Sequence, residues 1–225
     1  MRICIEGNMG VGKSTLCSYL LGGSIHFAPE PKFGGFGSGF GIEIKYLLER
    51  YRLWREISDV HTGESLLKEY VLYDRSCWSS EIFWRVGTFL EDLSMDESKL
   101  LHEIWDTLRP NCSPPDCIVY LDAPVTASLE RVRLRGLDDA EVDIAYLARM
   151  KSEYEMWLIH QELTYKTPTL RYDVSQDMTI SEQQQFSQRV FRDLKEIFPD
   201  IYDSSVPPPE DKGDFSTTFE GESLG

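Results

Sequence analysis

Nine residues near the start of the chain have the types and spacing to bind a triphosphate. Residues 7–14 fit the pattern G-x-x-x-x-G-K-[ST], and a threonine follows. Glycines in such a loop let successive backbone N–H groups point at an anion. The lysine reaches the β- and γ-phosphates, and the serine hydroxyl binds Mg²⁺. The nucleotide-binding residues predicted here are Gly7, Asn8, Met9, Gly10, Val11, Gly12, Lys13, Ser14 and Thr15.

Acidic and basic side chains follow three later segments that predict strands. Glu30 follows the second expected strand, Asp74 and Arg75 follow the third, and Asp122 follows the fourth. One carboxylate beside a γ-phosphate can accept a proton from an attacking hydroxyl, and another can hold Mg²⁺. An arginine beside them stabilises developing negative charge. A parallel sheet would bring all of these groups to the phosphate loop.

Two arginines predict a lid over the phosphates. Arg131 and Arg135 are four residues apart and therefore share one face of an expected helix. Gly136 and an acidic stretch follow them. Paired arginines next to a glycine hinge suit a segment that closes on a triphosphate.

The elements that must position these groups alternate along the chain. The expected strands are residues 2–6, 24–28, 70–73, 117–121 and 170–174. The expected helices are residues 14–21, 42–57, 79–93, 97–108, 125–135, 142–162 and 181–198, the last with Ser181 as its N-cap. This alternation predicts an α/β fold of the P-loop NTPase type, with three layers. A five-stranded parallel sheet would be flanked by helices and would carry the arginine-bearing lid.

Length and composition favour one domain with a tail. The 225 residues are 41% hydrophobic, which is enough for one sizeable α/β core. We expect a catalytic domain over residues 1–200. Residues 203–225 contain three consecutive prolines and six acidic residues against one lysine, which predicts a disordered tail. Residues 34–41 are rich in glycine and predict a loop.

Charge, hydrophobic runs and cysteine spacing indicate which partners and which compartment to expect. A net charge of −15 disfavours nonspecific binding to nucleic acid and to anionic membranes. No run of about 18 apolar residues is present, so we expect no membrane span. The five cysteines lack C-x-x-C spacing and indicate buried free thiols in a reducing compartment. We therefore expect a cytoplasmic protein.

Taken together, these motifs resemble those of the deoxynucleoside kinases. That family includes deoxycytidine, deoxyguanosine and mitochondrial thymidine kinases, with relatives in insects and large DNA viruses. The resemblance runs from about residue 2 to residue 198 and rests on the order of the motifs. It implies ATP-dependent phosphorylation of the 5′-hydroxyl of a deoxynucleoside for nucleotide salvage. It also implies ATP and Mg²⁺ as cofactors, and a homodimer.

The resemblance assigns roles on the donor side of the site. Glu30 would be the general base for the 5′-hydroxyl, and Arg75 would contact both that hydroxyl and Glu30. Asp74 stands where relatives usually have Glu and would help to bind Mg²⁺, together with Ser14 of the phosphate loop. Arg131 and Arg135 would clasp the ATP phosphates.

On the acceptor side, the resemblance places a base-binding pair in the helix over residues 42–57. Glu43 falls on a Gln that hydrogen-bonds the base in relatives, and Trp84 falls near an aromatic residue that stacks on it. For the 3′-hydroxyl we expect Glu141, with Asp139, Tyr46 or Tyr51 as alternatives. The predicted substrate-binding residues are Glu30, Glu43, Arg50, Ser80, Trp84 and Glu141.

Departures from the family pattern concern the base. An ionised Glu43 only accepts hydrogen bonds and suits guanine, whose edge presents two donors, whereas a protonated Glu43 offers a donor and an acceptor. The aromatic residue that relatives carry shortly after the general base is displaced to Phe33 or Phe36. Leu137 replaces an arginine that relatives often have in the lid.

Three other functions fit parts of the pattern. A nucleoside monophosphate kinase of the thymidylate kinase type shares the P-loop, the Asp-Arg pair and the arginine lid. Its phosphorylated acceptor needs an extra basic residue near Glu30, where only Lys32 is available. A GTPase switch is disfavoured because the guanine-reading Asn-Lys-x-Asp sequence is absent. A non-catalytic nucleotide-binding protein has no use for a general base such as Glu30.

Overall fold

Five parallel strands form the central sheet of the computed structural model, in the order β2-β3-β1-β4-β5. The structure describes residues 1–21, 25–33, 39–60, 70–135 and 142–201. The strands are β1 (Arg2–Gly7), β2 (Ile25–Ala28), β3 (Tyr70–Asp74), β4 (Cys117–Asp122) and β5 (Thr169–Asp173). All four neighbouring pairs are parallel. The predicted five-stranded parallel sheet of an α/β fold is confirmed.

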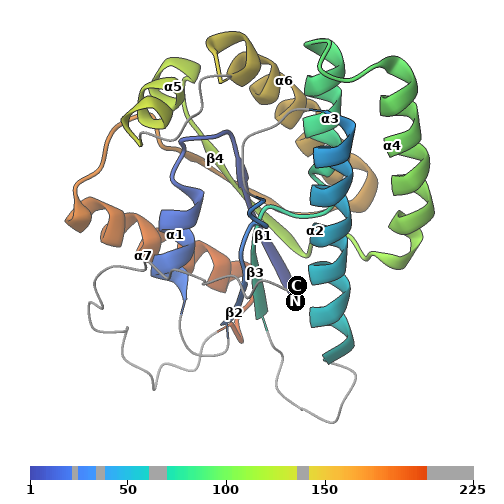
Figure 1. The fold of residues 1–225 in the computed structure, drawn as a ribbon. Helices are drawn as coiled ribbons and strands as arrows, with labels where there is room; N and C mark the ends of the chain where they lie inside the picture. The colour runs from blue at the N-terminus through green and yellow to red at the C-terminus, as the bar shows by residue number, and fades with distance from the viewer. Residues whose placement is uncertain (22–24, 34–38, 61–69, 136–141, 202–225) are drawn as a thin grey trace, which may run out of the picture.

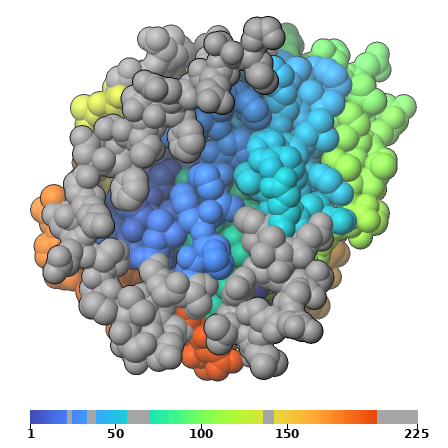
Figure 2. All heavy atoms as spheres, turned by 60° about the horizontal axis from the view of Figure 1, so that its bottom comes forward, coloured from blue at the N-terminus to red at the C-terminus, as the bar shows by residue number. Residues whose placement is uncertain are grey.

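Helices cover both faces of this sheet (Figure 1). The α-helices are α1 (Lys13–Leu20), α2 (Phe40–Val60), α3 (Ser80–Phe89), α4 (Met95–Leu108), α5 (Val125–Leu134), α6 (Ile144–His160) and α7 (Ile180–Ile197). A short 3₁₀ turn, Arg109–Asn111, follows α4, and a π-helical turn, Gln161–Tyr165, follows α6. In the space-filling view α2 lies directly against α4 (Figure 2). Within the described ranges, no helix combines the length and apolar character needed to cross a bilayer.

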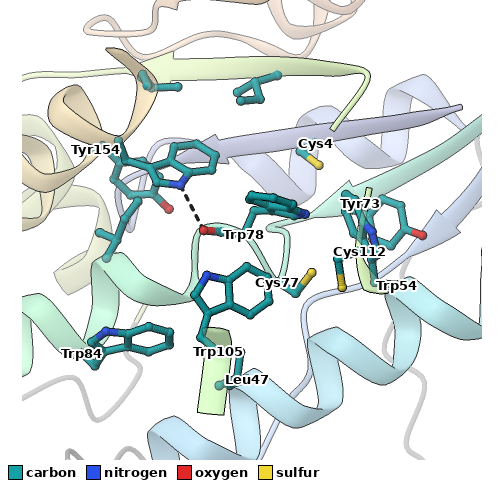
Figure 3. Packing of buried hydrophobic residues seen from close by; sticks show 14 of the residues in the cluster. Cys4, Leu47, Trp54, Tyr73, Cys77, Trp78, Trp84, Trp105, Cys112 and Tyr154 are labelled. Atoms are coloured by element: carbon teal, nitrogen blue, oxygen red, sulfur yellow. Dashed lines mark hydrogen bonds between the residues drawn. The ribbon is translucent and has the colours of Figure 1, made fainter. Parts of the chain in front are cut away.

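Alternate residues of the strands face two separate cores, as the pleat of a strand requires. Ile3 and Ile5 of β1 pack with Leu16 of α1 and Leu194 of α7. Cys4 lies between them in sequence and faces the opposite core. That second core is built on side chains from α2, α3, α4 and α6, including Leu47, Trp54, Trp84, Trp105 and Tyr154 (Figure 3). Because both faces are covered, three consecutive residues of β1, Ile3, Cys4 and Ile5, are apolar and fully buried.

The start of the last helix differs from the prediction. Thr179, not Ser181, is its N-cap, because the Thr179 side chain accepts from the backbone N–H of Glu182. The Glu182 carboxylate accepts in return from the backbone N–H of Thr179. This reciprocal capping box stabilises the helix start two residues earlier than Ser181 would.

The helix predicted over residues 79–93 is shorter than expected. It ends at Phe89. The chain then turns at Glu91, whose φ is 65°, and the backbone N–H of Asp92 donates to the Gly87 carbonyl. A second capping box, between Ser94 and Glu97, starts α4 at Met95. The left-handed backbone at Glu91 prevents α3 from continuing. The chain therefore reverses there, and α3 and α4 pack against each other.

Candidate active site

The phosphate loop connects β1 to α1 in a shape that needs glycine. Gly10 and Gly12 have φ values of 76° and 91°, in the region that side chains disfavour. A Cβ atom on Gly10 would lie 2.5 Å from the Ser128 carbonyl oxygen, and one on Gly7 would lie 2.5 Å from that of Leu121. The loop therefore packs directly on the end of β4 and on α5.

Lys13 lies inside this loop. Its side chain is buried, and its Nζ donates to the Asn8 carbonyl oxygen over 2.8 Å. Burial and the nearby charge of Arg75 lower the pKa of Lys13 to about 8, although Asp74 and Glu30 oppose the shift. A triphosphate in the loop would bring negative charge to this ammonium group and offset its loss of hydration.

Ser14 and Asp74 form the candidate magnesium site. The Ser14 hydroxyl donates to Asp74 Oδ2 over 2.7 Å. Asp74 is buried at the end of β3, and its Oδ1 has no hydrogen-bond partner among the described residues. Buried carboxylate oxygens are normally paired, and Mg²⁺ is bound through one or two carboxylates, water and substrate phosphates. An unpartnered carboxylate oxygen beside a serine hydroxyl fits this ion.

Glu30, predicted as the general base, is held by two arginines. Arg50 Nη2 donates to Glu30 Oε1 over 2.7 Å, and Arg75 Nε forms an ion pair with the same oxygen at 3.0 Å. Arg50 also donates to the Ser80 hydroxyl over 3.2 Å. Burial alone would raise the pKa of Glu30, but the charges of Arg75, Arg50 and Lys13 outweigh burial and lower it. The carboxylate is therefore ionised at neutral pH.

Aromatic rings pack around these two arginines. The Cζ atoms of Arg50 and Arg75 lie 4.8 Å and 4.7 Å from the centroid of the Phe83 ring. Arg50 also lies 5.1 Å from the ring of Tyr46, which the ring of Phe33 meets edge-on at 4.8 Å. Such contacts hold a guanidinium group while leaving its N–H groups free for hydrogen bonds. Phe33, one of the two positions proposed for the displaced aromatic residue, thus packs on Tyr46 beside these arginines.

Trp84 does not take part in this arrangement, which corrects the prediction that it stacks on the base. It is fully buried in the core between α3 and α4 (Figure 3), and its indole N–H donates to His102 Nε2 over 3.3 Å. Phe83, one residue earlier, faces the arginines instead. Both residues lie near Ser80 on the helix, so spacing alone does not separate them. The difference is that a buried indole N–H needs an acceptor, which His102 on α4 supplies.

Glu43 lies in the first turn of α2, seven residues before Arg50. Its side chain is half-buried. Burial raises the pKa of this carboxyl to about 7, although the charge of Arg50 opposes the shift. Both protonation states are therefore populated at neutral pH, so Glu43 changes between acceptor-only and mixed hydrogen bonding there.

The predicted lid arginines line a groove beside the phosphate loop. The groove has a volume of about 350 Å³, and Gly10, Gly12, Arg131 and Arg135 lie along it. Arg131 is bound by two residues that also line the groove: its Nε donates to Asp177 Oδ1 over 2.8 Å, and its Nη1 donates to the Val174 carbonyl over 2.8 Å. Arg131 therefore connects α5 to the segment after β5.

Several predictions fall on residues that lie outside the described ranges. These are the sugar contact at Glu141 or Asp139, the lid residues Gly136 and Leu137, the alternative aromatic Phe36, and the tail over residues 203–225. The other predicted side chains of the acceptor site, Glu30, Glu43, Arg50 and Ser80, lie at one end of the sheet with Asp74 and Arg75.

The chain is similar to known nucleoside kinases in sequence and in fold. The deoxyguanosine kinase of Bacillus subtilis (strain 168) is 24% identical over 169 residues, which cover 68% of this chain and 76% of that protein. The deoxycytidine kinase of Homo sapiens is 24% identical over 242 residues, which cover 91% of this chain and 88% of that protein. The solved deoxyadenosine kinase from M. mycoides with bound dATP has a TM-score of 0.65 at 17% identity, over 85% of this chain and 99% of that one.

The family assignment rests on a match over most of the chain. The deoxynucleoside kinase family model matches residues 37–198. The matched part includes Glu43 and Arg50 of α2, both residues of the Asp74-Arg75 pair, and α3 to α7. The chain therefore belongs to the deoxynucleoside kinase family and is an enzyme that phosphorylates deoxynucleosides.

Proposed function

We propose that this kinase transfers the γ-phosphoryl group of ATP to the 5′-hydroxyl of a deoxynucleoside, with Glu30 as general base, in nucleotide salvage. The observation that supports this best is the arrangement of Glu30. Both arginine contacts fall on Oε1, which leaves Oε2 for an acceptor hydroxyl. The side chain of Glu30 is 31% exposed, so a substrate can reach it.

The pKa of Glu30 suits the late proton transfer of this reaction. A carboxylate whose pKa is lowered is a weak base, yet it is always ionised at neutral pH. In phosphoryl transfer the attacking hydroxyl loses its proton late, as bonding to phosphorus forms. Glu30 therefore orients the hydroxyl first and accepts the proton as the product ester forms.

The donor half of the site is the P-loop. Its backbone N–H groups and Lys13 would hold the β- and γ-phosphates, and the groove beside Arg131 and Arg135 would take the rest of ATP. Asp74 and Ser14 would hold Mg²⁺, which would neutralise charge on the phosphate oxygens when bound. Arg75, next to Glu30, stabilises the negative charge that develops between donor and acceptor.

Glu43 is our proposed reader of the base. Its half-buried carboxyl lies on the same helix as Arg50, which binds the general base. When ionised it accepts from two donors, as on the edge of guanine. When protonated it matches a base that presents one donor and one acceptor.

The test is an assay with radiolabelled ATP against the four deoxynucleosides and dTMP. We expect label on at least one deoxynucleoside and none on dTMP, and transfer to dTMP alone would show a nucleoside monophosphate kinase instead.

The variant Glu30→Gln should lower kcat by about 10²–10⁴-fold. Glu49→Gln is the matched control, because Glu49 lies on α2 and pairs only with the exposed Arg52 among the described residues. It should retain the turnover of the natural chain.

A further inference from the structure

Glu6 is a buried carboxylate that the proposed reaction does not use. It is the residue of β1 directly before Gly7, and none of its surface is exposed. Burial raises its pKa above the ordinary value, while the charge of Arg75 and the donors of Ser76 and Ser79 oppose the rise. A carboxylate in the interior is costly unless hydrogen bonds compensate for lost hydration. Two of the residues that bind this carboxylate also fix Arg75: Ser76, which follows it in the chain, and Tyr154, which accepts from its side chain.

One oxygen of Glu6 holds the backbone that follows Arg75. Oε1 accepts from the backbone N–H of Ser76 over 2.9 Å and from the Ser76 hydroxyl over 2.8 Å. Arg75 itself has a φ of 68°, which is rare for a residue with a long side chain. Such a conformation persists only where its surroundings impose it. The two bonds from Ser76 to Glu6 are part of those surroundings.

The other oxygen of Glu6 holds the side chain of Arg75 through Tyr154. The Tyr154 hydroxyl on α6 donates to Glu6 Oε2 over 3.2 Å and accepts from Arg75 Nη1 over 2.6 Å. Tyr154 is fully buried, and so is most of Arg75. Arg75 is thereby held by Tyr154 at Nη1 and faces Glu30 Oε1 at its Nε, 3.0 Å away.

We propose that Glu6 and Tyr154 are positioning residues, which hold the guanidinium group of Arg75 in place against Glu30 from inside the core. The inference rests on the proposed function, because it assumes that Arg75 and Glu30 act in phosphoryl transfer. It assigns no contact with substrate to either residue. The chain of hydrogen bonds runs in one direction, from Arg75 to Tyr154 to Glu6.

Because the hydrogen bonds run in this direction, the substitution Glu6→Gln tests whether Glu6 must accept from both Ser76 and Tyr154. The backbone N–H of Ser76 can only donate, so in Glu6→Gln the amide oxygen of the new side chain would have to face it. The NH₂ group would then face Tyr154, which already accepts from Arg75. The tyrosine O–H would lose its acceptor, and two donors, the new NH₂ group and Arg75, would then compete for the tyrosine oxygen. Glu6→Gln preserves size and shape but reverses one hydrogen bond.

The experiment compares Tyr154→Phe, Glu6→Gln and the double variant in the full chain. We expect kcat to fall by about 10- to 100-fold in each single variant, because a small misplacement of a catalytic group costs that much. KM for ATP should stay within about twofold, since the P-loop is untouched. The double variant should be no less active than the less active of the two single variants, because the two residues act as one unit.

Tyr172→Phe is the matched control. It removes the bond from another buried tyrosine hydroxyl, to Asp193 over 2.7 Å, in the core on the other face of the sheet. Its turnover should stay within about twofold of that of the natural chain even where its melting temperature falls, because no catalytic group is displaced. If Tyr154→Phe loses stability but keeps full turnover, the inference is wrong.

Repeating the Tyr154→Phe substitution in an Arg75→Ala variant separates the positioning of Arg75 from a general effect on the fold. In Arg75→Ala, adding Tyr154→Phe should cause no further loss of kcat, because there is no guanidinium group left to hold. A further loss of tenfold or more would contradict the inference. Where Glu6→Gln does not fold, Tyr154→Phe, which removes a single oxygen atom, decides the matter. If the natural chain phosphorylates no deoxynucleoside, the proposed function itself fails, and this result differs from every outcome above.

Discussion

The Ser14 hydroxyl donates a hydrogen bond of 2.7 Å to Asp74 Oδ2, which joins the first turn of α1 to the end of β3. These residues are sixty positions apart in sequence. The parallel pairing of β1 with β3, in which Ile5 lies opposite Asp74, brings them together. The bond leaves Asp74 Oδ1 without a partner among the described residues.

We expect Asp74→Asn to weaken the use of Mg²⁺. A neutral amide is a poorer ligand than a carboxylate, so the Mg²⁺ concentration for half-maximal activity should rise by about 10- to 100-fold. A titration of activity with Mg²⁺ at saturating ATP measures this. The exposed Asp106 on α4 gives the control Asp106→Asn, which should leave the titration unchanged. An unaltered Mg²⁺ requirement in Asp74→Asn would remove Asp74 from the metal site.

The affinity for ATP should depend on pH through Lys13. Its pKa is about 8 in the free protein, and bound phosphates would raise it, so binding above pH 8 takes up a proton. Affinity should be complete below pH 8 and should fall about tenfold for each further pH unit. Calorimetry between pH 7 and pH 9, in buffers that differ in ionisation enthalpy, measures both the affinity and the proton uptake. Lys13→Arg keeps its charge over this range and should show a flat profile, and the same flat profile in the natural chain would contradict the prediction.

The preference among bases should change near pH 7. Glu43 has a pKa of about 7, so its protonated form dominates at pH 6 and its ionised form at pH 8. We expect the ratio of kcat/KM for deoxyguanosine to that for thymidine to rise about a hundredfold over this interval, because the ionised fraction rises about tenfold while the protonated fraction falls about tenfold. Taking the ratio removes any pH effect on ATP. Glu43→Gln cannot ionise, so its ratio should stay constant and low.

Two glycines of the phosphate loop should differ in their tolerance of alanine. Gly12→Ala should destabilise the fold by about 1–2 kcal/mol, which is the cost of the left-handed backbone alone, because its Cβ meets no described atom within 4 Å. Gly10→Ala should cost roughly 3 kcal/mol or more, because strain adds to the contact with the Ser128 carbonyl. Denaturant unfolding of the two variants measures the difference. Equal losses would show that the loop moves away from α5 without cost.

Much of the fold could be predicted because its signals are local. The strand, glycine loop and helix at the N-terminus follow from residue types alone, and the remaining strands follow from short apolar runs between helices. The grouping of Glu30, Asp74 and Arg75 also follows, because all parallel strands of one sheet end at the same edge.

The parts that could not be predicted depend on contacts between helices. Nothing in the sequence shows that Trp84 turns to His102 on α4 while Phe83 turns to Arg50 and Arg75. The connection from Glu6 through Tyr154 spans 148 residues and reads in sequence as two ordinary core positions. The choice of Thr179 over Ser181 as a cap is the exception, since the T-x-x-E pattern of a capping box was present in the sequence.

The central position of β1 in the sheet has a consequence for the folding of the enzyme during synthesis. β1 lies between β3 and β4, and its Gly7 pairs with Leu121. Each of its neighbours is therefore distant in the chain, and such non-local pairing is slow to form. During synthesis the two strands that support the phosphate loop can both pair with β1 only after β4 has been made. Nascent chains halted before β4 should fail to bind nucleotide, although they already contain every residue of the loop.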